Sequence, residues 1–188
     1  MPGGKLIYLL NVSLVGYVET SDHSLAWGKV DDELHRWFND RTRELGASIY
    51  GRGLYEVMNA YWPTAESDPS ATKTQLEFAR IWARIPKIVM SRSLVAVEGN
   101  SRLERGDVEE VLARVRKEFS GDIDVGGATL AASFIKRGLV DEYRLVMHPV
   151  ILGGGTPFSP RLDRQIGLRL IETHRFESGV MYLRFVSA

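Results

Sequence analysis

The residues from Asp124 to Ile135 form the pattern in this chain that most strongly suggests chemistry. A short apolar run ends at two adjacent glycines, Gly126 and Gly127, and an apolar pattern with helical spacing follows them. Such a pattern is typical of a strand that runs into a helix N-terminus, where free N–H groups and the helix dipole attract anions. Glycine lets a phosphate approach the backbone because it has no Cβ. A tight turn that needs a positive φ at one glycine would explain the same residues equally well.

Two further strands are expected to end in groups that bind phosphate. The first ends at Gly51-Arg52 and the second at Ser91-Arg92-Ser93. In open α/β sheets, ligands lie beyond the carboxyl ends of the parallel strands, and guanidinium groups suit bidentate phosphate contacts. A single arginine after a strand is more often a solvated loop residue. Three such strand ends together predict a ligand with two or more phosphate groups.

Two well-known nucleotide-binding motifs are excluded. The segment from Gly46 to Gly51 has the glycine spacing of a P-loop, but Arg52-Gly53 stands where that motif requires lysine and a hydroxyl residue. The double glycine also does not match the Gly-x-Gly-x-x-Gly pattern of dinucleotide-binding Rossmann folds. A dinucleotide would therefore have to be held by a different architecture.

Composition limits the remaining classes of function. The 188 residues predict a single domain, 1–188, and a formal net charge of zero argues against nucleic acid as a partner. The chain has no cysteine, which excludes disulfides and thiolate chemistry, and its four histidines show no metal-ligand spacing. No apolar run approaches membrane-spanning length, so a cytoplasmic protein without a membrane partner is expected.

The elements that must position these groups alternate between strands and helices before the last third of the chain, where long strands dominate. Asp31 or Asp32 can cap a helix, and Asp107 with Glu110 resembles a capping box. Trp37 and Trp82 lie on apolar helix faces and are expected in the core. The expected strands lie at 5–14, 47–50, 87–90, near 122–126, 143–152, 168–175 and 180–186, and 64–71 is expected to be a loop. This order predicts an α/β fold with a mixed sheet and an antiparallel C-terminal hairpin.

Six segments resemble, in their order, the bacterial dihydrofolate reductase-like proteins. These segments are 11–18, 51–56, 87–92, 126–130, 139–143 and 149–158. The resemblance covers nearly the whole chain and is greatest for the C-terminal reductase domain of the bifunctional riboflavin-biosynthesis enzyme. It implies a dihydrofolate reductase-like three-layer fold with a mixed, mostly parallel central sheet, and NADPH as the cofactor.

The resemblance also implies roles for particular residues. Those expected to hold the pyrophosphate are Gly51, Arg52, Gly126, Gly127, Ala128, Thr129 and Leu130. Those expected at the 2′-phosphate are Ser91, Arg92 and Ser93. The loop with Val15 and Gly16 would border the nicotinamide. Asn11, Tyr17 and Trp27 are expected to contact the substrate. Tyr17, Trp27 and Trp62 could stack on a flat heteroaromatic ring, although aromatic residues more often serve packing. The family usually has aspartate where this chain has Val15 and threonine where it has Leu54, so two polar groups are missing.

Reduction of a C=N or C=O bond also needs a proton, and no donor is assigned. Five ionisable side chains lie near the expected pocket segments: Asp22, His23, Asp31, Asp32 and Glu56. Helix capping explains Asp31 and Asp32 better, and Glu56 suits the first turn of a helix. Water could deliver the proton instead.

The leading hypothesis is an NADPH-dependent reductase of a small pteridine, pyrimidine or flavin precursor. Reductions of the 5-amino-6-ribosylamino-uracil type and of the dihydrofolate type both fit it. The alternative is a non-catalytic NADPH-binding sensor or partner-binding protein, and a promiscuous flavin reductase is a third option. The family also implies a homodimer, for which the apolar runs 143–152 and 180–186 could serve, but these runs could equally belong to the core.

Overall fold

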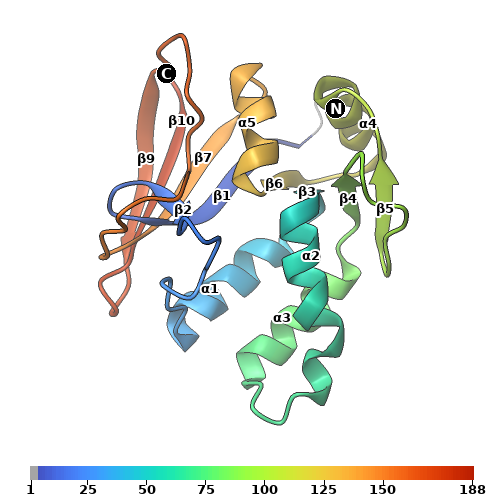
Figure 1. The fold of residues 1–188 in the computed structure, drawn as a ribbon, viewed down its shortest axis with the longest axis vertical. Helices are drawn as coiled ribbons and strands as arrows, with labels where there is room; N and C mark the ends of the chain where they lie inside the picture. The colour runs from blue at the N-terminus through green and yellow to red at the C-terminus, as the bar shows by residue number, and fades with distance from the viewer. Residues whose placement is uncertain (1–3) are drawn as a thin grey trace.

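The computed structural model describes residues 4–188, which fold around one eight-stranded sheet (Figure 1). Its strand order is β5-β4-β3-β6-β1-β7-β10-β9. The strands are β1 (Leu6–Ser13), β3 (Leu45–Gly51), β4 (Lys87–Met90), β5 (Ser101–Glu104), β6 (Asp122–Gly126), β7 (Glu142–His148), β9 (Leu168–Arg175) and β10 (Met181–Ser187). The six strands from β5 to β7 are parallel, and β10 and β9 add an antiparallel hairpin. A second, two-stranded sheet pairs β2 (Tyr17–Glu19) with β8 (Thr156–Pro157).

Helices cover both faces of the large sheet, as Figure 1 shows. On one face, α4 (Val108–Glu118) and α5 (Ala128–Lys136) pack on alternate side chains of the parallel strands, including Tyr8, Ile49 and Val125. On the other face lie α1 (Asp32–Arg43), α2 (Arg52–Tyr61), a 3₁₀ helix η1 (Trp62–Ser67) and α3 (Lys73–Arg84). The strands are apolar on both faces because both faces are covered. The three-layer α/β fold with a mixed, mostly parallel sheet is thus confirmed.

Several local predictions are confirmed and others are wrong. Asp31 caps α1 by accepting a hydrogen bond from the Leu34 amide, and Trp82 is buried in the core. The predicted capping box at Asp107 is wrong, because that side chain bonds the Glu109 amide and Glu110 does not reciprocate. A capping box is present at α3 instead, between Thr72 and Gln75.

Two segments fold differently from expectation for reasons of tertiary context. The predicted loop 64–71 begins with the last residues of η1, which follow directly on α2. The strand β5 was not predicted, because its four half-buried residues have no apolar alternation and form a strand only by pairing with β4.

The C-terminal apolar runs also differ from the prediction. β7 ends at His148, since Pro149 follows and cannot donate a backbone hydrogen bond, and Ile151 is exposed. Tyr143, Val146 and Tyr182 are buried in the core, so most of this apolar surface is not available to a second copy of the chain. The edge strand β9 carries three further exposed apolar side chains, Leu168, Leu170 and Ile171.

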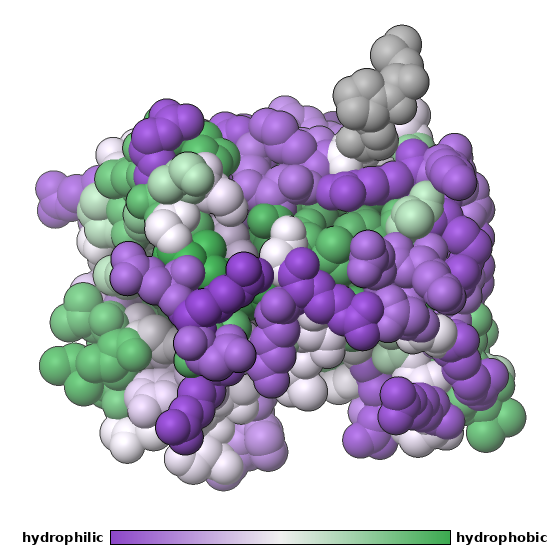
Figure 2. Space-filling view, turned by 90° about the horizontal axis from the view of Figure 1, so that it is seen from above, coloured by the Kyte–Doolittle hydropathy of each residue, from purple (hydrophilic) through white to green (hydrophobic). Residues whose placement is uncertain are grey.

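The outer surface is largely polar. Seen from above, it shows hydrophilic side chains over most of this face, with hydrophobic ones in smaller patches between them (Figure 2). Within residues 4–188, no helix combines the length and apolar composition needed to cross a membrane.

Candidate functional site

The carboxyl ends of four neighbouring strands bring the predicted phosphate-binding segments together. β4, β3, β6 and β1 are adjacent and parallel, so the residues that follow them share one edge of the sheet. Ser91-Arg92-Ser93 follows β4, Gly51 ends β3 and is followed by Arg52, and Gly127 follows β6. At this edge an extended ligand can contact all three segments at once, as expected at the carboxyl ends of a parallel sheet.

Two helices begin at this edge, and neither has a side-chain cap. α2 starts after Gly51 and α5 after Gly127, and neither glycine can supply a side-chain acceptor for the first-turn N–H groups. The other three α-helices are capped by Asp31, Thr72 and Asp107. Because α2 and α5 begin at neighbouring strands, their positive ends lie at the same edge, and this arrangement fits a pyrophosphate.

The double glycine was explained either by an anion site at a helix N-terminus or by a turn that needs a positive φ. Gly127 fits both explanations, since it precedes the first residue of α5 and has a φ of 92°. Replacing Gly127 with alanine is therefore expected to lower the free energy of unfolding by roughly 2 kcal/mol, because side chains disfavour this backbone conformation. Urea unfolding would measure the change. Gly53→Ala is the matched control, because a Cβ at Gly53 meets no atom within 4 Å and the residue is helical. An equal loss in both variants would contradict the argument.

The charged and hydroxyl groups of this edge are mostly free to meet a ligand. Arg52 is exposed and makes only a loose ion pair of 3.8 Å with Glu56. Arg92 is exposed, and among residues 4–188 no ion pair or hydrogen bond holds its guanidinium. The Ser91 hydroxyl accepts hydrogen bonds from the amides of Ser93 and Leu94, at 3.2 and 3.1 Å, and so shapes the turn that carries Arg92.

The first turn of α5 and the start of α2 pack closely against each other. A Cβ on Gly51 would lie 3.2 Å from the Cβ of Leu130, and one on Gly126 would lie 2.2 Å from Cδ2 of Leu54. Leu54 therefore covers the double glycine with an apolar side chain, where the resemblance leads one to expect a threonine hydroxyl. In this turn Ala128 is half-buried against the core and Thr129 is exposed.

The loop that follows β1 lies at the same edge. Val15 is exposed, and Gly16 has a φ of 82° with open space beside it. The amide of Tyr17 donates to the Ser13 hydroxyl, at 3.0 Å, where the chain turns into β2. Because β1 and β6 are parallel neighbours, this loop and the double glycine leave the sheet in the same direction.

Asn11 and Trp27 meet at His148, the last residue of β7. Nε2 of His148 lies 2.9 Å from Oδ1 of Asn11, and the Trp27 ring packs edge-on against the imidazole at 5.5 Å. Since Oδ1 can only accept, Nε2 carries the hydrogen. Burial lowers the pKa of His148, and the negative charge of Asp31 offsets this only in part, so the imidazole is neutral at neutral pH. The assignment of Asn11, Tyr17 and Trp27 to the substrate stays a prediction.

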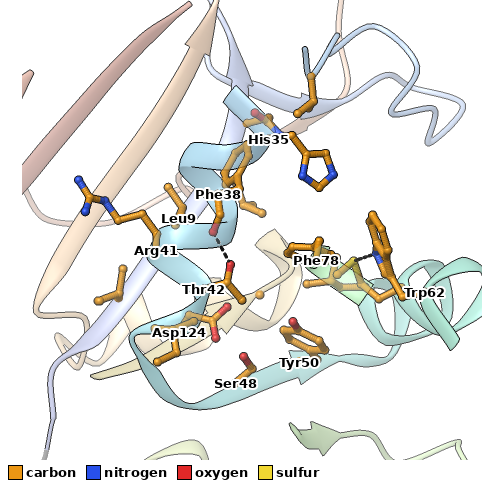
Figure 3. A pocket seen from close by; sticks show the side chains of 18 of the residues that line it. Leu9, His35, Phe38, Arg41, Thr42, Ser48, Tyr50, Trp62, Phe78 and Asp124 are labelled. Carbon is orange, nitrogen blue, oxygen red and sulfur yellow. Dashed lines mark hydrogen bonds between the residues drawn. The ribbon is translucent and has the colours of Figure 1, made fainter. Parts of the chain in front are cut away.

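A cavity of about 500 Å³ lies between the sheet and the layer of α1, α2 and α3 (Figure 3). Much of its wall is aromatic: Phe38 from α1, Trp62 from η1, Phe78 from α3 and Tyr50 from β3. Trp62 and Phe78 stand 4.5 Å apart, and Phe78 meets His35 edge-on at 5.6 Å. Its size and apolar aromatic lining are typical of a small-molecule site.

The cavity adjoins the predicted phosphate-binding edge. Asn11 and Gly126 line the cavity near the carboxyl ends of β1 and β6, and Leu54 lines it from the first turn of α2, which follows β3. A ligand with phosphates at the edge can therefore extend an aromatic ring towards the cavity mouth.

Sequence reasoning missed the ionisable group on the sheet side of this cavity. Asp124 lies in the middle of β6 and its side chain points into the cavity next to Ser48 and Thr42 (Figure 3). Burial raises the pKa of Asp124 to about 6, and the Ser48 hydroxyl and the backbone only partly offset this. The available signal was a carboxylate between Ile123 and Val125, inside an apolar strand.

The five ionisable residues considered as proton donors have structural partners outside the cavity. Asp31 caps α1, and Asp32 accepts from the Thr74 hydroxyl and pairs with Arg36 at 2.8 Å. Asp22 accepts from the Thr20 hydroxyl, His23 lies 2.8 Å from Glu19, and Glu56 faces Arg52. None of the five lines the cavity. Among residues 4–188 there is also no group of three or more side chains suited to hold a metal ion.

Comparison with known proteins agrees with this geometry. Residues 4–182 match the RibD C-terminal domain family. An uncharacterised protein of Bacillus subtilis (strain 168), YyaP, is 31% identical over 180 residues, which cover 95% of this chain and 93% of YyaP.

Two solved structures share the fold at low sequence identity. The deaminase/5-amino-6-(5-phosphoribosylamino)uracil reductase of Thermotoga maritima has a TM-score of 0.70 at 14% identity, over 99% of this chain and 57% of that one. Dihydrofolate reductase from Enterococcus faecalis, complexed with NADP(H), has a TM-score of 0.67 at 16% identity, over 98% of this chain and 97% of that one. This chain, with its dihydrofolate reductase-like fold, belongs to the RibD C-terminal domain family.

Proposed function

We propose that this protein is an NADPH-dependent reductase of a small flat heterocycle of the pteridine, pyrimidine or flavin-precursor type. The observation that carries the proposal is the carboxyl edge of the sheet, where two uncapped helix N-termini and two exposed arginines adjoin an aromatic cavity. The phosphates of a dinucleotide suit the edge, and a flat ring suits the cavity. The names of the two solved relatives, one a uracil-type reductase and one bound to NADP(H), support the same cofactor and substrate class.

Different residues of the edge contact different phosphate groups of the cofactor. The N-termini of α2 and α5, with Arg52, face the pyrophosphate, and the Ser91-Arg92-Ser93 turn faces the 2′-phosphate. Bound NADPH supplies a hydride from its nicotinamide C4 to the substrate, whose reduction is completed by a proton from water or an acid. The aromatic walls exclude bulk water from the substrate and orient its ring by stacking.

Removing the Arg92 guanidinium is expected to weaken NADPH binding by about 10- to 100-fold, the range for a lost bidentate contact with phosphate. Binding of NADH, which lacks the 2′-phosphate, is expected to stay the same. Calorimetric titration of wild type and Arg92→Ala with NADPH, NADH and NADP⁺ measures both effects. Arg80→Ala is the control, since Arg80 is an exposed residue of α3 paired with Glu66, away from this edge. Failure of every nucleotide to bind wild type would overturn the proposal.

A non-catalytic NADPH-binding protein is the second candidate, and the packing of Leu54 favours it. This side chain lies over the double glycine, where a hydroxyl would otherwise meet the pyrophosphate. A protein of this kind binds NADPH without oxidising it in the presence of any pterin or pyrimidine. Steady oxidation of NADPH in the presence of one such compound, followed as the loss of its absorbance at about 340 nm, would exclude this candidate.

A further inference from the structure

The cavity beside the cofactor edge offers a ligand mostly apolar surface. Its aromatic side chains come from α1, α2, η1, α3 and β3, and His35, Phe38 and Phe78 lie opposite the sheet (Figure 3). Across from them, β3 and β6 place Ser48 and Asp124 next to each other, because these residues are direct partners in the parallel register. A flat ring that enters between the aromatic walls therefore meets the carboxyl group at its edge.

Most of the other polar side chains of the cavity are already bonded to the protein. The Asn11 carboxamide bonds His148, the Thr42 hydroxyl donates to the Phe38 carbonyl at 2.8 Å, and the Arg144 guanidinium donates to Glu142. These groups have little capacity left to recognise a ligand.

Asp124 is different. Its Oδ1 atom is buried and, within the described part of the chain, has no hydrogen-bond partner. A buried acceptor without a donor is costly, and the cost disappears when a ligand supplies the donor. The raised pKa of Asp124 agrees with a carboxyl group that lacks compensating charge. The other titratable groups that line the cavity are Tyr50, which lies opposite Gly126 in β3, and His35, Arg41, Tyr61 and Arg144.

We propose that Asp124 is the specificity-determining residue of this cavity and accepts a hydrogen bond from an amino group or ring N–H of a flat nitrogen heterocycle. This inference rests on the proposed function, since it names the feature by which the substrate of the same site is recognised. The ligand class is an amino-substituted pyrimidine or a fused ring that carries the same edge. A ring with only acceptors at that edge leaves Oδ1 unpaired and is rejected, because like groups repel and a buried polar group stays unsatisfied.

Two probes of matched shape test this recognition, namely 2,4-diaminopyrimidine and 2,4-dimethylpyrimidine. They differ in that methyl groups replace the N–H donors. Titrations followed by NMR, above neutral pH, are expected to show at least about 10-fold tighter binding of the diamino compound to wild type. Asp124→Leu is expected to abolish this preference, and Asp124→Asn to reduce it while keeping the size of the side chain. Asp40→Leu, on the exposed part of α1 outside the cavity, is expected to keep it.

NADPH titrations of the same samples separate the possible failures. Suppose that NADPH binds to wild type. If wild type then does not prefer the diamino compound, or if both Asp124→Leu and Asp124→Asn keep the preference, the inference about Asp124 is wrong and the proposed function stands. If NADPH does not bind wild type, the proposed function fails. If Asp124→Leu does not fold, Asp124→Asn decides: an unchanged preference overturns the inference, and a reduced one supports it.

Discussion

Replacing Glu142 with glutamine is expected to lower the free energy of unfolding by about 3 kcal/mol at neutral pH. Glu142 is fully buried and accepts hydrogen bonds from three cations, Lys5 at 2.7 Å, Arg144 at 2.6 Å and Arg184 at 2.7 Å. Glutamine keeps the shape of the side chain but removes the negative charge that the three cations share, and of these only Arg184 keeps another carboxylate within residues 4–188, Glu172 at 3.1 Å. The partly exposed Lys5 and Arg184 can turn towards water, which keeps the loss at the low end of the range for a broken buried pair.

The loss is expected to depend on pH in a definite direction. Burial alone would raise the pKa of Glu142, but hydrogen bonds from Arg184, Lys5 and Arg144 outweigh it and lower the pKa from 4.5 to about 2. A lowered pKa means that the carboxylate stabilises the fold above pH 4.5 and loses this effect as the pH falls towards 2.

Urea unfolding of wild type and Glu142→Gln across this range measures the difference. The gap between the two proteins should be largest at neutral pH and should narrow in acid. Glu118→Gln is the control, because Glu118 is an exposed residue paired with Arg102, and its loss should cost under about 1 kcal/mol. A gap that is the same at every pH would show that Glu142 acts through packing and not through its charge.

Asp124→Asn is expected to act in the opposite direction and to stabilise the protein without ligand. The pKa of Asp124 is raised by burial from 3.8 to about 6. Between these values the folded state binds more protons than the unfolded state, so the wild type loses stability as the pH rises. The shift corresponds to about 3 kcal/mol, all of which is lost above the folded pKa.

The measurement is the difference in unfolding free energy between Asp124→Asn and wild type as a function of pH. It should increase by about 3 kcal/mol from below pH 3.8 to above pH 6, in favour of the variant. Ser48→Ala serves as a comparison, since it removes a neighbouring hydroxyl but no titrating group. If the difference does not change with pH, the carboxyl group of Asp124 is not desolvated in the folded protein.

Glu142 and Asp124 are carboxylates of the same sheet whose charges have opposite effects on stability. Glu142 on β7 is neutralised by cations and supports the fold, whereas Asp124 on β6 forms no ion pair within residues 4–188 and weakens it. A residue that costs stability and points into a cavity is the kind of residue that binding sites retain. The stability prediction and the binding prediction for Asp124 are therefore two consequences of one unpaired group.

The sequence by itself determined the class of the fold and placed the predicted phosphate-binding segments at the ends of its strands. The alternation of apolar strands and amphipathic helices and the glycines at 51, 126 and 127 are local signals, because the spacing and the backbone freedom of each segment are set by its own residues. The Asp31 cap and the burial of Trp82 could be predicted for the same reason.

Only the tertiary structure decided which distant residues meet. β5 exists through its pairing with β4, and the cations around Glu142 come from positions 5, 144 and 184. The parallel register of β3 and β6 sets Asp124 beside Ser48, while α1 and α3 close the cavity over them. Sequence spacing carries no information about these contacts, because register and helix packing are settled by the burial of the whole apolar surface.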